Sequence, residues 1–167
     1  MNAKTKKLVL SSLMAAITCV ATMIIKIPSP LKGYINLGDG IILLSGWMLS
    51  PAYGFLAAGI GSALADVISG YMTYVPATFL VKGLMAVIAC HGFKILHNKV
   101  GNIPARIISG AAAECIMVLG YFVFEGLLYG FVPSAVNIPA NSIQGIAGIV
   151  IGISIMKVFE KNKMMFD

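Results

Sequence analysis

Long apolar runs separated by short polar stretches cover almost all of the 167-residue chain. Because a helix needs about 20 apolar residues to cross a bilayer, this pattern predicts an all-α integral membrane protein, a six-helix transmembrane bundle with short loops. We expect one transmembrane domain over residues 1–167, with spans at approximately 8–25, 37–49, 52–69, 78–96, 107–128 and 135–159. The second span is short for a full crossing, and a tight turn at Ser50-Pro51 follows it. Spans two and three therefore suit an irregular hairpin that lines a cavity.

Composition supports this class and excludes others. The chain is 59% hydrophobic and 11% charged, whereas soluble domains have about 25% charged residues. The sequence has no phosphate-binding loop, no metal-ligand spacing and no serine–histidine or cysteine–histidine arrangement at one depth. We therefore predict no enzyme activity, no cofactor and no metal site. Cys19, Cys90 and Cys115 lie in apolar runs, and we interpret them as small buried residues.

The distribution of basic residues predicts the orientation in the plasma membrane. The net charge is +6, but the basic residues flank apolar spans, which indicates topology rather than nucleic-acid binding. With six spans, one side carries Lys4, Lys6, Lys7, Lys94, Lys99, Arg106, Lys157, Lys161 and Lys163. Loops on the other side carry only Lys26 and Lys32. The positive-inside rule then places both termini in the cytoplasm, and we interpret the N-terminal apolar run as a retained first span.

Charged residues inside the second to fourth spans indicate a polar cavity. Asp39, Asp66 and Lys82 lie within apolar runs, where each charge costs about 2.5–3.5 kcal/mol on insertion scales unless it has a partner, water or a ligand. In an up-and-down hairpin all three lie near the same side of the membrane. Two interpretations remain open: an Asp66–Lys82 salt bridge that holds the hairpin to the fourth span, or side chains that face a ligand.

Two further stripes of polar residues, on the fifth and sixth spans, extend toward the same side of the membrane. Glu114, Tyr121 and Glu125 share one helical face, and Asn137, Asn141 and Gln144 share another. The amides either bond neighbouring helices or join a shared outward-facing ligand pocket. The predicted ligand-binding residues are Tyr34, Asn36, Asp39, Tyr74, Lys82, Glu114, Tyr121, Glu125, Asn137, Asn141 and Gln144. We expect the main contacts from Glu125 and Asn141, closed over by the 34–36 loop. Such a set suits a small polar heterocycle.

Small residues form a groove on one face of the first span. Ser11, Ser12, Ala15 and Ala16 are spaced so that another helix can approach closely. This face either packs within the protein or docks another subunit.

One motif extends across the second to fourth spans. It comprises Asn36-Leu37-Gly38-Asp39, Ser50-Pro51, Gly59 to Asp66, Gly70-Tyr71, Tyr74, Pro76, Thr78 and Lys82-Gly83. With the six short-looped spans and the small face of the first span, the chain resembles a substrate-binding S component of an energy-coupling-factor (ECF) vitamin transporter. The motif is similar to a riboflavin-type subgroup that includes members assigned to hydroxymethylpyrimidine or pyridoxine.

The resemblance implies a mechanism and partners. An S component binds a vitamin from outside and associates, within membrane lipid, with a transmembrane coupling protein and two cytoplasmic ATPases. Ser11-x-x-x-Ala15 and Ser12-x-x-x-Ala16 would correspond to the family's Ala-x-x-x-Ala docking motif. We favour hydroxymethylpyrimidine or a vitamin B6 ring, because carboxylates pair with their ring edges; riboflavin would need more aromatic surface. The alternative classes are a self-sufficient transporter and a membrane scaffold protein.

Overall fold

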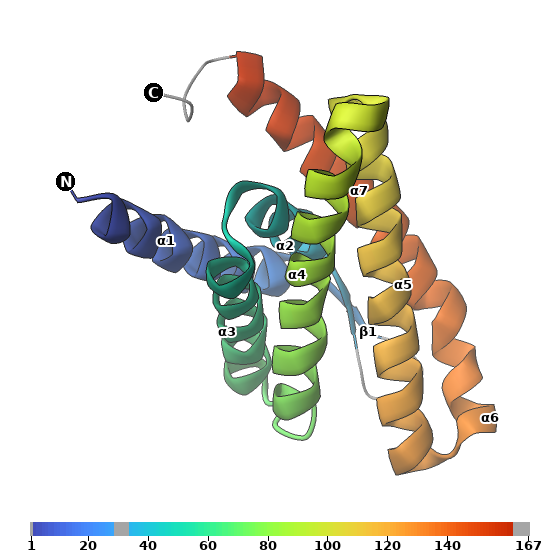
Figure 1. Cartoon of the computed structure of the whole chain (residues 1–167). Helices are drawn as coiled ribbons and strands as arrows, with labels where there is room; N and C mark the ends of the chain where they lie inside the picture. Colours follow the sequence, from blue (N-terminus) through green and yellow to red (C-terminus); the bar gives the residue numbers. More distant parts are fainter. Residues whose placement is uncertain (1, 29–33, 162–167) are drawn as a thin grey trace.

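The computed structural model describes residues 2–28 and 34–161. Lys32, Lys163 and the helix breakers Pro30 and Gly33, which entered the sequence predictions, lie outside the described residues. The elements are α1 (Ala3–Ile24), β1 (Lys26–Pro28), β2 (Tyr34–Asn36), α2 (Gly38–Met48), α3 (Pro51–Ser69), α4 (Val75–Val100), α5 (Asn102–Tyr129), α6 (Phe131–Ser134), η1 (Ala135–Asn137) and α7 (Ile138–Lys161). Figure 1 shows their arrangement.

Local sequence explains where several helices begin and end. The Asn2 side chain accepts a hydrogen bond from the Lys4 backbone N–H at 3.1 Å and caps α1. Pro51 occupies the first turn of α3, where its missing N–H costs nothing. Gly70 ends α3 in the left-handed region at φ 81°, which glycine adopts without a Cβ penalty. These signals give α3 sharp boundaries.

Five helical segments are long and apolar enough to cross a membrane: Lys4–Ile24, Pro51–Ser69, Val75–Val100, Asn102–Tyr129 and Phe131–Lys161. The sixth expected span corresponds to α2, which has 11 residues and rises only about 16 Å. Its residues from Gly38 to Trp47 are all buried. The described residues thus give five spanning candidates around a short internal helix.

A small β-hairpin replaces part of the loop that we expected between the first two spans. β1 and β2 pair antiparallel, with Lys26 opposite Asn36 and Ile27 opposite Ile35. The predicted all-α fold is confirmed, and this two-stranded hairpin is a local exception within the described residues. The pairing places Tyr34 and Asn36 at a defined position beside α7, because the Asn36 backbone N–H donates to the Gln144 side chain at 2.8 Å.

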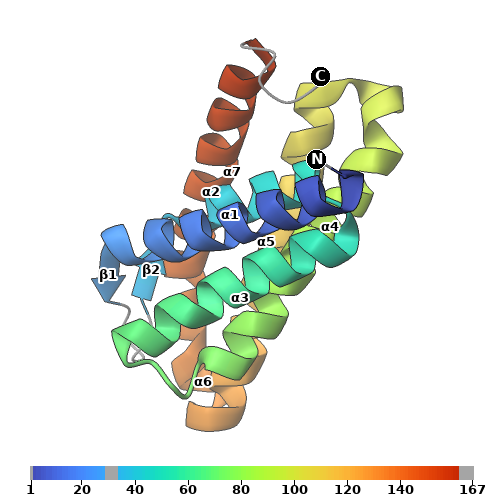
Figure 2. The same ribbon diagram turned by 90° about the vertical axis from the view of Figure 1, so that its left-hand side faces the viewer.

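The helices run in two main directions. α4 and α5 lie side by side and extend along the molecule, while α1 crosses it at a steep angle and packs on α2 and α3 (Figures 1 and 2). The connection from α3 to α4 and the α5–α6 connection lie at one end of the molecule (Figure 1). The connection from α4 to α5 and the C-terminal end of α7 lie at the other end.

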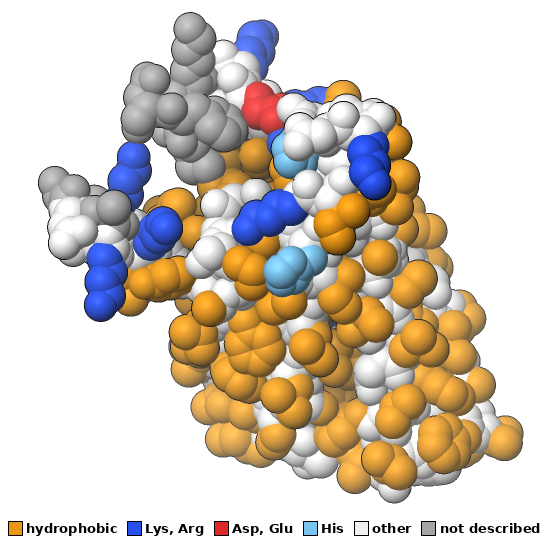
Figure 3. Space-filling view, viewed as in Figure 1, with side chains coloured by type: hydrophobic (Ala, Val, Ile, Leu, Met, Phe, Trp, Pro, Cys, Tyr) orange, Lys and Arg blue, Asp and Glu red, His pale blue; other side chains and the backbone are white. Residues whose placement is uncertain are grey.

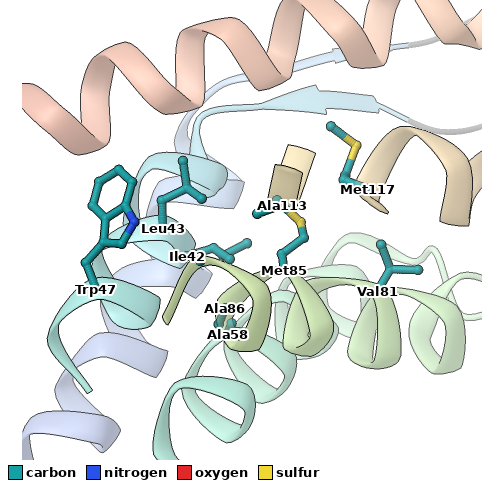
Figure 4. Packing of buried hydrophobic residues seen from close by; sticks show 10 residues of the cluster. Ile42, Leu43, Trp47, Ala58, Val81, Met85, Ala86, Ala113 and Met117 are labelled. Carbon is teal, nitrogen blue, oxygen red and sulfur yellow. The ribbon is translucent and has the colours of Figure 1, made fainter. Parts of the chain in front are cut away.

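The apolar core surrounds α2. Ile42 and Leu43 are fully buried and pack with residues of α3, α4 and α5 (Figure 4). The cluster contains Ile42, Leu43, Trp47, Ala58, Val81, Met85, Ala86, Ala89, Ala113 and Met117. The Trp47 indole N–H donates to the Ser109 hydroxyl at 3.1 Å, so the tryptophan side chain is part of the core. Four members of the cluster are alanines, which let the helix backbones approach closely.

The outer surface is largely apolar, as expected for contact with lipid. Large hydrophobic side chains are exposed along the long helices, for example Leu64 on α3, Leu84 on α4 and Leu119 on α5. On the face shown in Figure 3, hydrophobic side chains cover the lower body, and lysine and arginine side chains gather at the upper and left-hand parts. The exposed apolar belt and the charged end identify a membrane protein.

Candidate functional site

A cavity opens at the end of the bundle that carries the α3–α4 connection, with about 500 Å³ of empty space. Its walls come from α1, β2, α3, α4, α5, α7 and the α3–α4 connection. The lining residues are Thr22, Tyr34, Asn36, Ser62, Asp66, Tyr71, Tyr74, Thr78, Lys82, Tyr121, Glu125, Asn141 and Gln144. Eight of the eleven predicted ligand-binding residues are in this set. A concave site lined by aromatic rings and converging polar groups is typical of a small-molecule site.

A buried ion pair forms one part of the cavity wall. The Lys82 ammonium donates to Asp39 Oδ1 at 2.5 Å, and the two side chains are 3% and 0% exposed. The Gln144 amide N–H₂ donates to the other oxygen of Asp39. Asp39 therefore lies behind the wall and holds Lys82 and Gln144, which line the cavity. Of the two interpretations left open by the sequence, the Asp66–Lys82 salt bridge is not formed, because the ammonium pairs with Asp39.

The opposite part of the wall is built around Glu125. Its carboxylate accepts from the Asn137 amide at 3.0 and 2.9 Å and from the Tyr74 hydroxyl at 3.2 Å. Asn137 is 2% exposed and lies behind Glu125 rather than in the cavity lining. Because Asn137 belongs to η1, the short turn before α7 orients a carboxylate of α5. Burial and the negative charge of Glu125 raise the pKa of Tyr74 above its ordinary value, so the phenol remains a donor.

Aromatic side chains cover a third side. Tyr34 donates to Asp66 Oδ1 at 2.6 Å, and its ring lies 4.8 Å from that of Tyr71, measured between centroids. Burial and the hydrogen bond to Asp66 raise the pKa of Tyr34 above its ordinary value. The Tyr71 and Tyr74 rings meet edge to face at 6.5 Å. These three tyrosines give the cavity an apolar wall with hydroxyl groups at its edge.

Tyr121 completes the wall beside Lys82. Its hydroxyl donates to Thr78 at 3.2 Å, and the Lys82 ammonium lies 5.4 Å from the centre of its ring. The predicted stripe on the fifth span thus brings Tyr121 and Glu125 into the cavity. Asn141 and Gln144 also line it, as the predicted stripe on the last span requires.

Glu114 lies deeper than the cavity and does not line it. It is 5% exposed, and neither carboxylate oxygen has a hydrogen-bond partner in the described residues. It faces α7, where a Cβ placed on Gly148 would lie 2.9 Å from Glu114 Oε1 and 2.8 Å from the Cβ of Asp39. Because Gly148 has no side chain, Asp39 and Glu114 can both pack against α7 at this position. No group of three or more His, Cys, Asp or Glu in the described ranges is arranged to hold a metal ion.

Comparison with known proteins decides the family. A family model described as "ECF-type riboflavin transporter, S component" matches residues 2–161. The chain belongs to this family. It is a substrate-binding transport subunit and not an enzyme. The family leaves no support for the two alternative classes, the self-sufficient transporter and the membrane scaffold.

One relative and two solved structures are also similar to this chain. An uncharacterised protein of Pyrococcus woesei is 34% identical over 143 residues, which cover 85% of this chain and 93% of the relative. Among solved structures, the S component of a bacterial ECF transporter has a TM-score of 0.69 at 21% identity and covers 95% of this chain and 97% of its own. An S component for biotin has a TM-score of 0.61 at 21% identity, with coverages of 94% and 95%. The two structures show that the S component shares their fold.

The predicted docking residues of this S component lie along a groove between α1 and α3. The groove is lined by Leu8, Ser11, Ser12, Ala15, Ala16, Tyr53, Leu56, Ala57, Ile60 and Leu64. Ser12 and Ala16 are exposed, whereas Ser11 is buried and donates to the Tyr53 carbonyl at 3.1 Å. Ser11 therefore packs against α3, whereas Ser12 and Ala16 form an open surface.

Sequence reasoning missed Thr22, Ser62, Tyr71 and Thr78 as cavity residues of the S component, and it weighed Asp66 only as an alternative. Ser62 and Asp66 are four residues apart on α3, the same spacing that identified the other stripes. Thr78 and Lys82 repeat this spacing on α4. Thr22 gave no such signal, because only the crossing of α1 over the bundle brings it to the cavity.

Proposed function

We propose that this S component binds a small vitamin ring, hydroxymethylpyrimidine or a form of vitamin B6, and takes it up as part of an ECF transporter. The observation that carries the proposal is the charge of the cavity. Its lining contains the carboxylates of Asp66 and Glu125, and its lysine, Lys82, is already paired with Asp39. Such a wall favours a ligand that donates hydrogen bonds or carries positive charge, as these amino and pyridinium rings do.

The aromatic surface of the cavity supports a single small ring. Tyr34, Tyr71, Tyr74 and Tyr121 line it, and tyrosine rings stack on heterocycles while their hydroxyls stay hydrogen-bonded. The protein's tryptophan, Trp47, is 8% exposed and lies in the core around α2. The flat three-ring system of riboflavin would have only tyrosine faces to stack on.

The arrangement of charges supports a cavity that opens outward. The cavity lies at the end with the α3–α4 connection, while His97, Lys99, Arg106 and Lys161 lie toward the opposite end. The positive-inside rule assigns the basic end to the cytoplasm, together with both termini. We count α2 as the sixth membrane-embedded helix, shielded from lipid by its neighbours. The ligand would then enter from outside the cell.

The proposed partners follow from the family and from the exposed groove. The S component would dock a transmembrane coupling protein at the face with Ser12 and Ala16, and that protein would connect it to two ATPases. The described chain offers small side chains there, which allow close approach of a second helix. Lipid would cover the remaining apolar surface.

Riboflavin is the second candidate cargo, because the matching family model carries its name. The structural neighbours include an S component for biotin, so the fold itself accommodates chemically different vitamins.

Isothermal titration of the purified protein with hydroxymethylpyrimidine, pyridoxine, riboflavin and biotin tests the proposal. We expect saturable one-to-one binding of a pyrimidine or B6 ring, lost in Glu125→Gln. The control variant, Glu160→Gln, makes the same chemical change in a residue that pairs with Arg106 toward the basic end. Binding of riboflavin with no response to either small ring would overturn the proposal.

A further inference from the structure

Within the described residues, two buried polar atoms of the cavity wall have no hydrogen-bond partner. They are Ser62 Oγ and Asp66 Oδ2, whose residues are 1% and 4% exposed. Other buried unpartnered atoms in the described ranges belong to Arg106, Glu114 and Asn137, none of which lines the cavity. Since buried polar groups are normally hydrogen-bonded, Ser62 and Asp66 are the places where a ligand would complete the cavity.

The Asp66 carboxylate is held with one oxygen unoccupied. Its Oδ1 accepts the Tyr34 hydroxyl at 2.6 Å, which fixes the orientation of the carboxylate. The Thr78 hydroxyl accepts from Tyr121 and lies close enough to the Asp66 carboxylate to hydrogen-bond with it. Asp66 Oδ2 nevertheless has no partner within the described residues. An ionised carboxylate only accepts hydrogen bonds. A group that meets Asp66 Oδ2 must therefore be a donor.

Ser62 lies one helical turn before Asp66, on the same face of α3. Its hydroxyl can donate one hydrogen bond, and this donor is unused within the described structure. An acceptor on the ligand beside the donor that meets Asp66 would engage both groups at once. A ring edge with an amino group next to an unprotonated ring nitrogen has this pattern.

Two other charged groups of the cavity, Glu125 and Lys82, are already partnered, which restricts how the ligand lies. Glu125 accepts from Asn137 and Tyr74, and Lys82 pairs with Asp39. A hydroxymethyl group suits this saturated side, because a hydroxyl can add to existing hydrogen bonds as donor or acceptor. The edge with the amino group is therefore best placed on the α3 side, beside the Tyr34 ring.

We propose that Ser62 and Asp66 form the specificity subsite of this S component and that its ligand is a 4-aminopyrimidine. The amino N–H donates to Asp66 Oδ2, and the adjacent ring nitrogen accepts from the Ser62 hydroxyl. This inference rests on the proposed function and selects the aminopyrimidine from the two vitamin rings considered there. Pyridoxine has no amino group beside its ring nitrogen.

Isothermal titration with two ligands tests the subsite: the aminopyrimidine, and its analogue with an oxo group in place of the amino group. We expect the wild-type protein to bind the oxo analogue about 30-fold more weakly. Asp66→Asn should weaken binding of the aminopyrimidine about 30-fold and Ser62→Ala about fivefold, with smaller effects on the oxo analogue. Ser45→Ala is the matched control, since the Ser45 hydroxyl bonds within α2, to the Ile41 carbonyl.

The outcomes separate this inference from the proposed function. If the wild-type protein binds neither the aminopyrimidine nor pyridoxine, the proposed function fails. If it binds both pyrimidines equally, or pyridoxine more tightly than the aminopyrimidine, the subsite is wrong and the proposed function stands. The comparison of ligands on the wild-type protein needs no variant, so it decides the question even if Asp66→Asn does not fold.

Discussion

Lys82 of α4 and Asp39 of α2 form an ion pair at 2.5 Å that is almost completely buried within the transmembrane bundle. Asp39 also accepts from Gln144 of α7, so one carboxylate joins three helices. Because Lys82 and Gln144 line the cavity while Asp39 lies behind it, the pair connects the cavity wall to the helix packing. Replacing Lys82 alone should therefore cost much more stability than replacing Lys82 and Asp39 together.

We predict that Lys82→Met lowers the free energy of unfolding by about 3–5 kcal/mol, because it leaves the Asp39 charge buried without its partner. The double variant Asp39→Asn, Lys82→Met removes both charges and should recover most of this loss. Thermal unfolding in detergent measures both. Additive losses in the double variant would show that the two residues do not act as a pair.

Glu114→Gln should unfold at the same temperature as the wild-type protein or higher. Neither carboxyl oxygen of Glu114 has a hydrogen-bond partner in the described structure, so an amide of the same shape removes no hydrogen bond. Glu125→Gln is the comparison, because the Glu125 carboxylate accepts from Asn137 and Tyr74; it should cost about 1–3 kcal/mol. A clearly lower melting temperature for Glu114→Gln would contradict this assignment.

We predict that the protein loses stability at alkaline pH as Tyr34 ionises. Its pKa is raised by burial and by the hydrogen bond to Asp66, so the folded protein keeps the proton that the unfolded chain releases above about pH 10. The stability from this residue is complete below that pH and falls as the pH rises further. Melting temperatures of the wild type and Tyr34→Phe, measured between pH 7 and 11, should converge as the pH rises. A constant difference would exclude this role for Tyr34.

Phosphorylated ligands should bind much more weakly than the free vitamin. The described cavity lining contains two carboxylates, and Lys82 is already paired with Asp39, so a phosphate group would meet mainly negative charge there. We expect the phosphate ester of the bound ring to lose at least about 100-fold in affinity, close to 3 kcal/mol. Competition titration against the free ring measures this ratio. Comparable affinities would indicate that Lys82 leaves Asp39 to bind the phosphate.

Substitution of the groove on α1 should separate transport from binding. Ala16→Trp fills the exposed small-residue face and should abolish co-purification with the coupling module while ligand affinity stays within about twofold. Ala111→Trp is the matched control, because Ala111 is an exposed alanine on α5 outside the groove. Retained co-purification of Ala16→Trp would place the docking surface elsewhere.

Periodicity predicted much of the fold and much of the cavity. Polar residues on one helical face inside an apolar run must face protein, which identified Tyr121, Glu125, Asn141 and Gln144. The same rule does not show which residues of a stripe reach the cavity and which lie behind its wall. Glu114 and Asn137 share these stripes, yet they lie behind the cavity.

Long-range geometry explains what the sequence pattern missed. Lys82 could pair with Asp39 of α2 or with Asp66 of α3, and the packing of the helices decides between them. Asp39 is the carboxylate that lies within reach. The strand pairing of Lys26–Pro28 with Tyr34–Asn36 was hidden because prolines and glycine suggested only a loop. Thr22 reaches the cavity through the steep angle of α1, which local pattern does not encode.

The crossing of α1 over the bundle has a thermodynamic consequence. One continuous helix of 22 residues carries the groove residues Ser12 and Ala16 and also Thr22 of the cavity wall. If the groove docks the partner and the cavity binds the vitamin, as proposed above, a shift of α1 that the partner favours also changes the vitamin site, and occupancy of that site affects the groove in return. Linkage makes the two effects equal in free energy. A coupling module that releases cargo through α1 must bind the empty subunit more tightly than the loaded one.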